Sequence, residues 1–225
     1  MPIDMPEMPA AVAAALATGL PRFAVAASPP AENVAAAMLA RPSITRSGRT
    51  ISRSIEAALA QGQGQGQGGA AGIGAPMVVM GLDELAKGKS PRQATARLWL
   101  QLLPAGAGGQ SALAEVDQQS GKLTSVSEGA EVKALARQID KLNKPASRSA
   151  STPRQELALI SVPALHLTAV WLKGDGNGAN DVVIPNEGPI APLVPGQRYP
   201  LAEFQKLVAV IAAERIAKTT GDMGG

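Results

Sequence analysis

The chain has 225 residues, a formal net charge of +3 and a sequence pI near 9.4. It contains no cysteine, which excludes disulfides, thiolate nucleophiles and cysteine-ligated metals, and its mild charge falls short of the clustered basic footprint of a dedicated nucleic-acid-binding domain. Aromatic residues are only 2% of the total, so the core must be built from Leu, Val and Ile. The bias toward Ala, Arg, Pro and Gly suggests a high-GC bacterial source.

Residues 1–75 are rich in Ala, Pro, Ser and Gly and are expected to form a flexible arm before the folded domain. Three short helical segments are predicted within the arm: Pro9–Thr18, Ala31–Leu39 and Ile51–Ala60. Helices this short are marginal without tertiary packing, so the arm is either weakly structured or gains its helices on a partner surface. Its last part, Gln61–Gly69, reads QGQGQGQGG and is a low-complexity linker.

The N-terminal apolar stretch Ala10–Leu20 lacks the charge order of a secretory signal, because Asp4 and Glu7 precede it and no Lys or Arg does. No apolar run reaches the ~18 residues of a membrane-spanning helix. We therefore expect a soluble, cytoplasmic protein without a membrane span, with export that needs no cleaved signal as the alternative.

The segment after the linker begins with a short apolar run, Pro76–Met80, which is either a strand or a piece packed against the domain. Gly88-Lys89-Ser90 resembles part of a phosphate-binding loop, but the glycine that such a loop requires is replaced by Asp83. Ser90 followed by Pro91 instead predicts a helix start, and a helix is expected over Pro91–Leu103. The apolar stretch Arg97–Leu103 also suits a strand.

A hairpin is predicted over Ser111–Ser127, with its turn at Gln119-Ser120-Gly121. An amphipathic helix follows over Ala130–Leu142, because its apolar residues recur on one stripe opposite charged ones. The basic, polar stretch Lys144–Arg154 is expected to be an exposed connector.

The longest apolar stretch is Leu157–Pro185, around which we expect the domain to be organised. From Ala164 its side chains alternate, with Leu165, Leu167, Ala169 and Trp171 predicted on one face of a strand and His166, Thr168, Val170 and Leu172 on the other. A glycine-rich loop and a short strand over Asp181–Ile184 complete a second hairpin.

The last predicted helix runs over Leu201–Lys218, and residues 219–225 are expected to form a disordered tail. The folded part, residues 76–218, is then a hairpin and helix followed by a second hairpin and helix. We predict an α+β fold, with an antiparallel sheet made of two ββα-like units and its helices on one face. Trp99, Trp171 and Phe204 are expected to anchor its core, with a binding groove beneath the glycine-rich loop as the alternative.

The only histidine, His166, is the one weak candidate for a catalytic residue. A nucleophile such as Ser161 or Thr168 lies near it in sequence, but no Gly-x-Ser-x-Gly turn is present. A structural histidine in mid-strand is therefore the preferred interpretation.

The sequence gives no stronger indication of a metal site, or of catalysis by paired carboxylates, than it does of catalysis by His166. The loop Asp175–Asp181 carries possible oxygen ligands at alternate positions, as a calcium loop does. A calcium loop would, however, need Asp or Asn in place of Ala179 and Glu in place of Asn186. The acids Glu115, Asp117 and Glu128 are read as solvated hairpin residues. We expect no metal and no cofactor.

These observations favour a non-catalytic protein–protein interaction or assembly module whose N-terminal arm binds a partner, with a protein partner or a homo-oligomer as the expected assembly. One alternative is a small hydrolase-like enzyme with a carboxylate or His166 site. Another is a nucleic-acid accessory protein, since Arg41, Arg46, Arg49 and Arg53 lie close together, but no aromatic residue lies among them to stack on bases.

Overall fold

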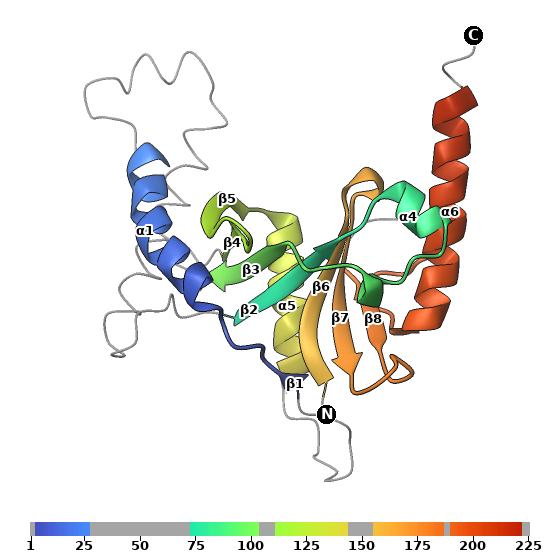
Figure 1. Ribbon diagram of the computed structural model, residues 1–225, viewed down its shortest axis with the longest axis horizontal. Helices are drawn as coiled ribbons and strands as arrows, with labels where there is room; N and C mark the ends of the chain where they lie inside the picture. Colours follow the sequence, from blue (N-terminus) through green and yellow to red (C-terminus); the bar gives the residue numbers. More distant parts are fainter. Residues whose placement is uncertain (1–2, 28–72, 104–110, 144–154, 187–189, 222–225) are drawn as a thin grey trace. The chain divides into compact units, whose positions relative to one another are not determined.

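The computed structural model describes residues 3–27, 73–103, 111–143, 155–186 and 190–221 (Figure 1). The chain divides into two compact units. The first unit contains residues 1–6, 75–97 and 137–225, and the second contains residues 7–74 and 98–136. The fold is α+β, as predicted, but its strands pair in both senses, so the sheet is mixed and mostly antiparallel rather than antiparallel throughout.

The sheet of the first unit is centred on β6 (Gln155–Val162) and β7 (Leu167–Gly174). Antiparallel pairing continues from β7 to β8 (Val182–Pro185) and from β8 to the two-residue β9 (Tyr199–Pro200). On its other side β6 pairs in parallel with β1 (Ile3–Asp4) and with β2 (Ile73–Val79). The second predicted hairpin is confirmed as β7 and β8.

The strand that precedes this hairpin, β6, is not foreseen from the sequence, and it changes the place of His166. A 3₁₀ turn over Pro163–Leu165 joins β6 to β7, and His166 follows it with a left-handed φ of 49°. The prediction of His166 and Leu165 in mid-strand is therefore wrong. In the sequence, the alternation of side chains typical of a strand includes residues 164–166. In the structure, Pro163 begins a turn, after which β7 runs back antiparallel to β6.

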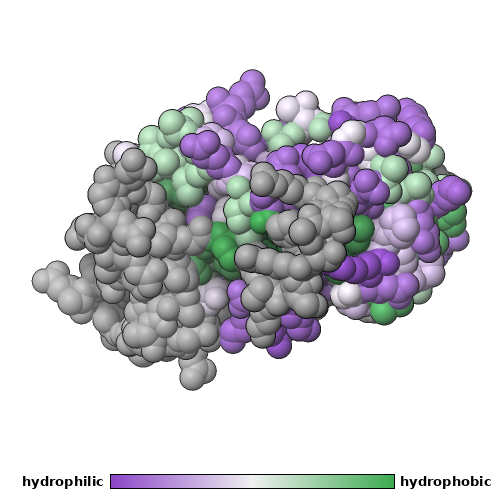
Figure 2. Space-filling view, turned by 90° about the horizontal axis from the view of Figure 1, so that it is seen from below, coloured by the Kyte–Doolittle hydropathy of each residue, from purple (hydrophilic) through white to green (hydrophobic). Residues whose placement is uncertain are grey.

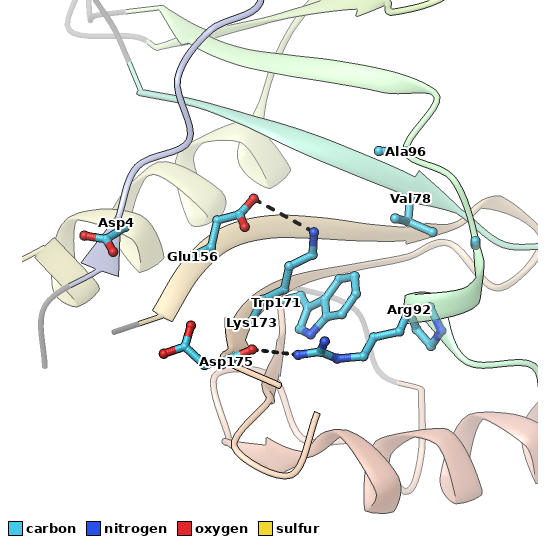
Figure 3. Close-up of a pocket in the computed structure, with 11 residues that line it drawn as sticks. Asp4, Val78, Arg92, Ala96, Glu156, Trp171, Lys173 and Asp175 are labelled. Carbon is cyan, nitrogen blue, oxygen red and sulfur yellow. Dashed lines mark hydrogen bonds and ion pairs between the residues drawn. The ribbon is translucent and has the colours of Figure 1, made fainter. Parts of the chain in front are cut away.

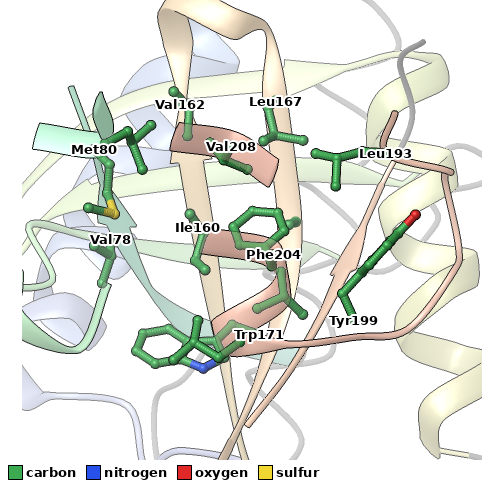
Figure 4. Packing of buried hydrophobic residues seen from close by; sticks show 14 of the residues in the cluster. Val78, Met80, Ile160, Val162, Leu167, Trp171, Leu193, Tyr199, Phe204 and Val208 are labelled. Atoms are coloured by element: carbon green, nitrogen blue, oxygen red, sulfur yellow. The ribbon is translucent and has the colours of Figure 1, made fainter. Parts of the chain in front are cut away.

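Both faces of β6 and β7 are buried, whereas the sequence predicted that only one face of the strand would lie in the core. Ala158, Ile160 and Trp171 belong to a core cluster with residues of α6 (Leu201–Gly221), among them Phe204 and Val208 (Figure 4). Side chains on the opposite face, Leu157, Leu159, Val170 and Leu172, are at most 2% exposed. A strand that is buried on both sides reads as a continuous apolar run, which explains why Leu157–Leu172 is so apolar.

Helix α6 confirms the predicted C-terminal helix. Leu201, Phe204, Val208 and Ala212 are buried at helical spacing, so one stripe of the helix faces the core. The short helix α4 (Leu82–Ala86) contributes Leu85 to the same core. From Ala213 to Thr219, every side chain of α6 except half-buried Ile216 is exposed.

The second unit pairs β3 (Leu98–Leu103), β4 (Ala112–Asp117) and β5 (Lys122–Glu128) in antiparallel order. The hairpin predicted over Ser111–Ser127 is confirmed as β4 and β5. The helix predicted over Pro91–Leu103 is wrong: only a 3₁₀ turn forms at Pro91–Gln93, and the alternative strand is present as β3. Six registered pairs with β4 hold β3 as a strand, and this pairing outweighs the local helix preference.

Helix α1 (Ala10–Ala27) completes the second unit. Val12, Leu16 and Leu20 are at most 1% exposed and share a cluster with Trp99 and Leu103 of β3. Gly19 makes this packing close, because a Cβ at Gly19 would lie 2.8 Å from the Cβ of Leu123. The predicted segment Pro9–Thr18 therefore falls on a packed helix, whereas those at Ala31–Leu39 and Ile51–Ala60 lie outside the described residues, as do the linker and the connector.

Helix α5 (Ala130–Asn143) matches the helix predicted over Ala130–Leu142. Its stripe of Val132, Leu135 and Ile139 is buried, and its charged residues Lys133, Arg137 and Asp140 are exposed. The grouping of the elements into two ββα units stays a prediction.

Candidate functional site

The carboxylate of Asp181, which is 1% exposed, is the acceptor of four hydrogen bonds in the first unit. Its Oδ2 accepts hydrogen bonds from Arg92 Nε at 2.8 Å and from Trp171 Nε1 at 2.9 Å. Its Oδ1 accepts from Arg92 Nη2 and from the backbone N–H of Gly174 at 2.9 Å. A buried charge requires this many partners, because an unpaired one would be strongly destabilising.

Arg92 also binds the glycine-rich loop between β7 and β8. Its Nη1 donates to the carbonyl of Gly176 at 2.8 Å and its Nη2 to that of Gly174 at 2.7 Å. The 3₁₀ turn that presents Arg92 is capped by Ser90, whose hydroxyl accepts from the Arg92 N–H at 3.3 Å. The clasp of Arg92, Asp181 and Trp171 therefore holds the loop against the 3₁₀ turn.

A hollow of about 440 Å³ lies beside this clasp (Figure 3). We call it the Trp171 hollow. Its charged lining residues come from β1, β6, β7, the start of the loop and the 3₁₀ turn. Its small apolar lining residues come from β2, from Pro91 and from the segment that follows the turn. The lining residues are Asp4, Val78, Pro91, Arg92, Ala94, Ala96, Glu156, Trp171, Lys173, Gly174 and Asp175.

Lys173 occupies part of this hollow. Its Nζ lies 4.9 Å from the centroid of the Trp171 ring and 3.9 Å from Glu156 Oε1. An ammonium above an indole face is attracted by the ring's negative π surface. Trp171 itself is 1% exposed, so Lys173 and the surrounding residues cover the indole.

His166 lies elsewhere, on the rim of a second concavity of about 370 Å³ that we call the α6 groove. Its apolar lining comes from the β6–β7 turn, from the 190s loop and from Ile211 of α6, and Glu214, Arg215 and Lys218 supply charge. The full lining is Ala164, Leu165, His166, Ile190, Ala191, Ile211, Glu214, Arg215 and Lys218. His166 is exposed, and no Ser or Thr lies among these lining residues, so the groove does not bring His166 together with Ser161 or Thr168.

Lys89, Ser90 and Asp117, which the sequence also singled out, have structural partners. Lys89 is ion-paired with Glu84, and Ser90 caps the following turn, so Gly88-Lys89-Ser90 holds no phosphate-loop geometry. Asp117 Oδ1 accepts from the N–H of Ser120 at 2.6 Å in the turn between β4 and β5. In the loop Asp175–Asp181 the last carboxylate is committed to Arg92, and this use was not foreseen from the sequence.

Hydrogen bonding shifts the pKa values of Arg92, Glu84 and Asp117. The side-chain hydrogen bond with Asp181 raises the pKa of Arg92 against the opposing effect of burial. The hydrogen bond from Lys89, and then that from the N–H of Gly81, lower the pKa of Glu84. The backbone hydrogen bond from Ser120 lowers the pKa of Asp117. All three shifts stabilise the charged form, as structural ion pairs and turns do.

No protein-family model, curated protein or solved structure matches this chain significantly. Among the described residues, no group of three His, Asp or Glu side chains is placed to hold a metal ion. No helix in the described ranges is both long enough and apolar enough to cross a bilayer.

Proposed function

We propose that the protein is a non-catalytic interaction module that docks an amphipathic segment of a partner protein in the α6 groove. The observation that carries the proposal is that α6 leaves its own core after Ala212 while the groove beside its last turns keeps an apolar lining. A helix face without a partner in its own domain is a common element of recognition surfaces.

Exposed apolar side chains support this location. Most of the described surface on the face shown in Figure 2 is hydrophilic, with smaller apolar areas between. The large hydrophobic residues that are exposed in the described ranges are Met5, Val194 and Val210, at 39%, 51% and 59%. Val210 precedes the groove residue Ile211 on α6, and Val194 belongs to the loop that supplies Ile190. Exposed apolar residues that adjoin a groove indicate an interaction surface.

The charges of the groove define the partner's chemistry. Arg215 and Lys218 outnumber Glu214 along the helix, so the groove complements a segment that carries acidic residues beside its apolar ones. The N-terminal residues 28–72 lie outside the described part of the chain, and their role as a partner-binding arm stays a prediction from the sequence.

A photo-crosslinking amino acid at Ala164, which is exposed and lines the groove, tests the proposal in cells that produce the protein. We expect a discrete adduct with one partner, identified by mass spectrometry. The double change Arg215→Glu and Lys218→Glu should abolish the adduct, because it reverses the charges that complement the partner. The control change Lys206→Glu, on exposed α6 surface outside the groove, should not.

The same photo-crosslinker at Ala202, exposed on the first turn of α6 and outside the groove, is the positional control. Equal adducts from both positions, or an adduct that survives the double charge reversal, would show that the groove is not the docking site. An adduct of twice the protein's own mass would replace the partner with a second copy of this chain.

A further inference from the structure

The glycine-rich loop between β7 and β8 contains an asparagine followed directly by a glycine, Asn177 and Gly178. Asn177 is exposed, and Gly178 has a left-handed φ of 91° and no side chain that could shield its backbone nitrogen. Within the described part of the chain, the N–H of Gly178 donates no hydrogen bond. This backbone nitrogen is therefore uncommitted and open to the neighbouring side chain.

The side chain of Asn177 is held beside that nitrogen. Its Oδ1 accepts a hydrogen bond from the backbone N–H of Ala179 at 3.3 Å, which folds the carboxamide back over the main chain. The main chain bridged in this way passes through Gly178, so the turn brings Cγ of Asn177 to the side of the Gly178 nitrogen. A hydrogen bond to Oδ1 also stabilises the negative charge that this oxygen gains when a nucleophile adds to Cγ.

We propose that Asn177 is a site of spontaneous deamidation in the folded protein. The lone pair of the Gly178 nitrogen forms a bond to Cγ of Asn177. The bond between Cγ and the side-chain nitrogen breaks, and that nitrogen leaves as ammonia with the proton of the Gly178 amide. Water then opens the resulting succinimide ring at either carbonyl and leaves an aspartate or an isoaspartate.

Either product changes the loop that Arg92 holds through the carbonyl of Gly176. Both add a negative charge, and isoaspartate also inserts a methylene group into the main chain. The change lies outside the lining of the α6 groove, so the inference does not depend on the function proposed for that groove.

Asn180, in the same loop, provides an internal control. It is exposed like Asn177, but the nitrogen that would attack its side chain belongs to Asp181. The Asp181 N–H donates to the carbonyl of Gly178 at 3.1 Å, and Asp181 is 1% exposed. Attack on Asn180 would require this hydrogen bond to break in a buried position, so folding should protect Asn180 and not Asn177.

Peptide mass spectrometry measures both sites in one sample. The full-length protein is incubated in its folded state in a mildly alkaline buffer, and the tryptic peptide of residues 174–198 contains both asparagines. Deamidation raises the mass by about 1 Da, and fragment ions assign the gain to a residue. A sample taken before incubation corrects for deamidation during digestion. We expect Asn177 to convert several times faster than Asn180.

Comparison with the unfolded chain separates the effect of the fold from that of the sequence. The ratio of the Asn177 rate to the Asn180 rate should be larger in the folded protein than in urea, because folding hinders only the attack on Asn180. Equal rates at the two sites, or a ratio that is no larger in the folded protein, would overturn the inference.

Two matched variants complete the test. Asn177→Gln keeps a carboxamide but requires a larger, less favourable ring, so it should remove most of the mass gain of the peptide. Asn180→Gln should leave the rate at Asn177 unchanged. Thermal melts of both variants check that the loop and its unit remain folded. A mass gain that persists in folded Asn177→Gln would mean that another residue of the peptide is modified, which would contradict the proposal.

Discussion

At the scale of single residues, Trp171 combines burial in the core of the first unit with a hydrogen bond to Asp181. It is 1% exposed, packs in the cluster that contains Phe204 and donates its indole N–H to Asp181. Trp171→Ala should lower the free energy of unfolding by about 3–5 kcal/mol, measured by urea denaturation. Lys173→Ala is the comparison, with an expected loss of about 0.5–1 kcal/mol, because its ammonium lies over the Trp171 ring. A small effect of Trp171→Ala would contradict the core assignment.

Asp181 supports a second prediction at this scale. Asp181→Ala should lower the free energy of unfolding by about 3–5 kcal/mol, since it removes the carboxylate that pairs with Arg92 and leaves the Trp171 indole and the Gly174 N–H without their acceptor. Asp175→Ala, six positions earlier on the exposed part of the same loop, should change it by no more than about 0.5 kcal/mol. Thermal melts of the two variants separate the outcomes, and equal melting temperatures would mean that the clasp does not hold the loop.

At the scale of elements, the turn between β4 and β5 should respond to pH through Asp117. The hydrogen bond from Ser120 lowers the pKa of Asp117 in the folded protein, so the folded state binds its proton less readily than the unfolded chain does. The stabilisation is therefore present above the unfolded pKa of about 4 and is lost as the pH falls through the lower, folded pKa. Asp117→Asn should flatten the acid limb of a plot of urea midpoint against pH, and Asp140→Asn should not. The same slope in all three proteins would exclude this contribution.

Helix α1 gives a second prediction for an element. Leu16 is 1% exposed and shares a cluster with Trp99 and Leu103, so Leu16→Ala should cost about 2–5 kcal/mol in the free energy of unfolding. Ala14→Ser, on the exposed side of the same helix, should be nearly silent, within about 0.5 kcal/mol. Denaturation followed by fluorescence detects both changes. If Leu16→Ala were equally silent, α1 would not be part of the core in solution.

At the scale of the whole molecule, the domain boundary expected near residue 75 separates β1 and α1 from the strands they contact. β1 pairs with β6 in the first unit, and α1 covers β4 and β5 in the second. We therefore expect a fragment of residues 75–225 to unfold at lower urea concentration than the full chain and to bind a dye for exposed apolar surface. The control is the full chain cleaved by a protease site inserted at Gly69, which keeps both elements. A fragment as stable as the full chain would assign residues 3–27 to an appended arm.

Local signals in the sequence were enough for the elements whose residues interact mainly with near neighbours. The stripe of α5, the apolar face of α6 and the β4–β5 turn follow from side-chain periodicity and turn residues within short windows. The alternation of side chains also predicted β7, but with a start at Ala164 that is too early. The turn over Pro163–Leu165 occupies those positions, and β7 begins at Leu167.

Long-range pairing decided the rest, because its energy depends on residues that no short window contains. Leu98–Leu103 suits a helix or a strand locally, and pairing with β4 makes it β3. Arg92 and Asp181 are 89 positions apart, and nothing in the spacing of either residue indicates that they form a bidentate pair. The same holds for the Trp171 hollow, whose acids come from β1, β6 and the loop after β7. Helices and strands form largely from interactions between residues that are near one another in the chain. A cluster of charged side chains forms only when the fold brings distant residues together, so the tertiary structure decides which of them meet.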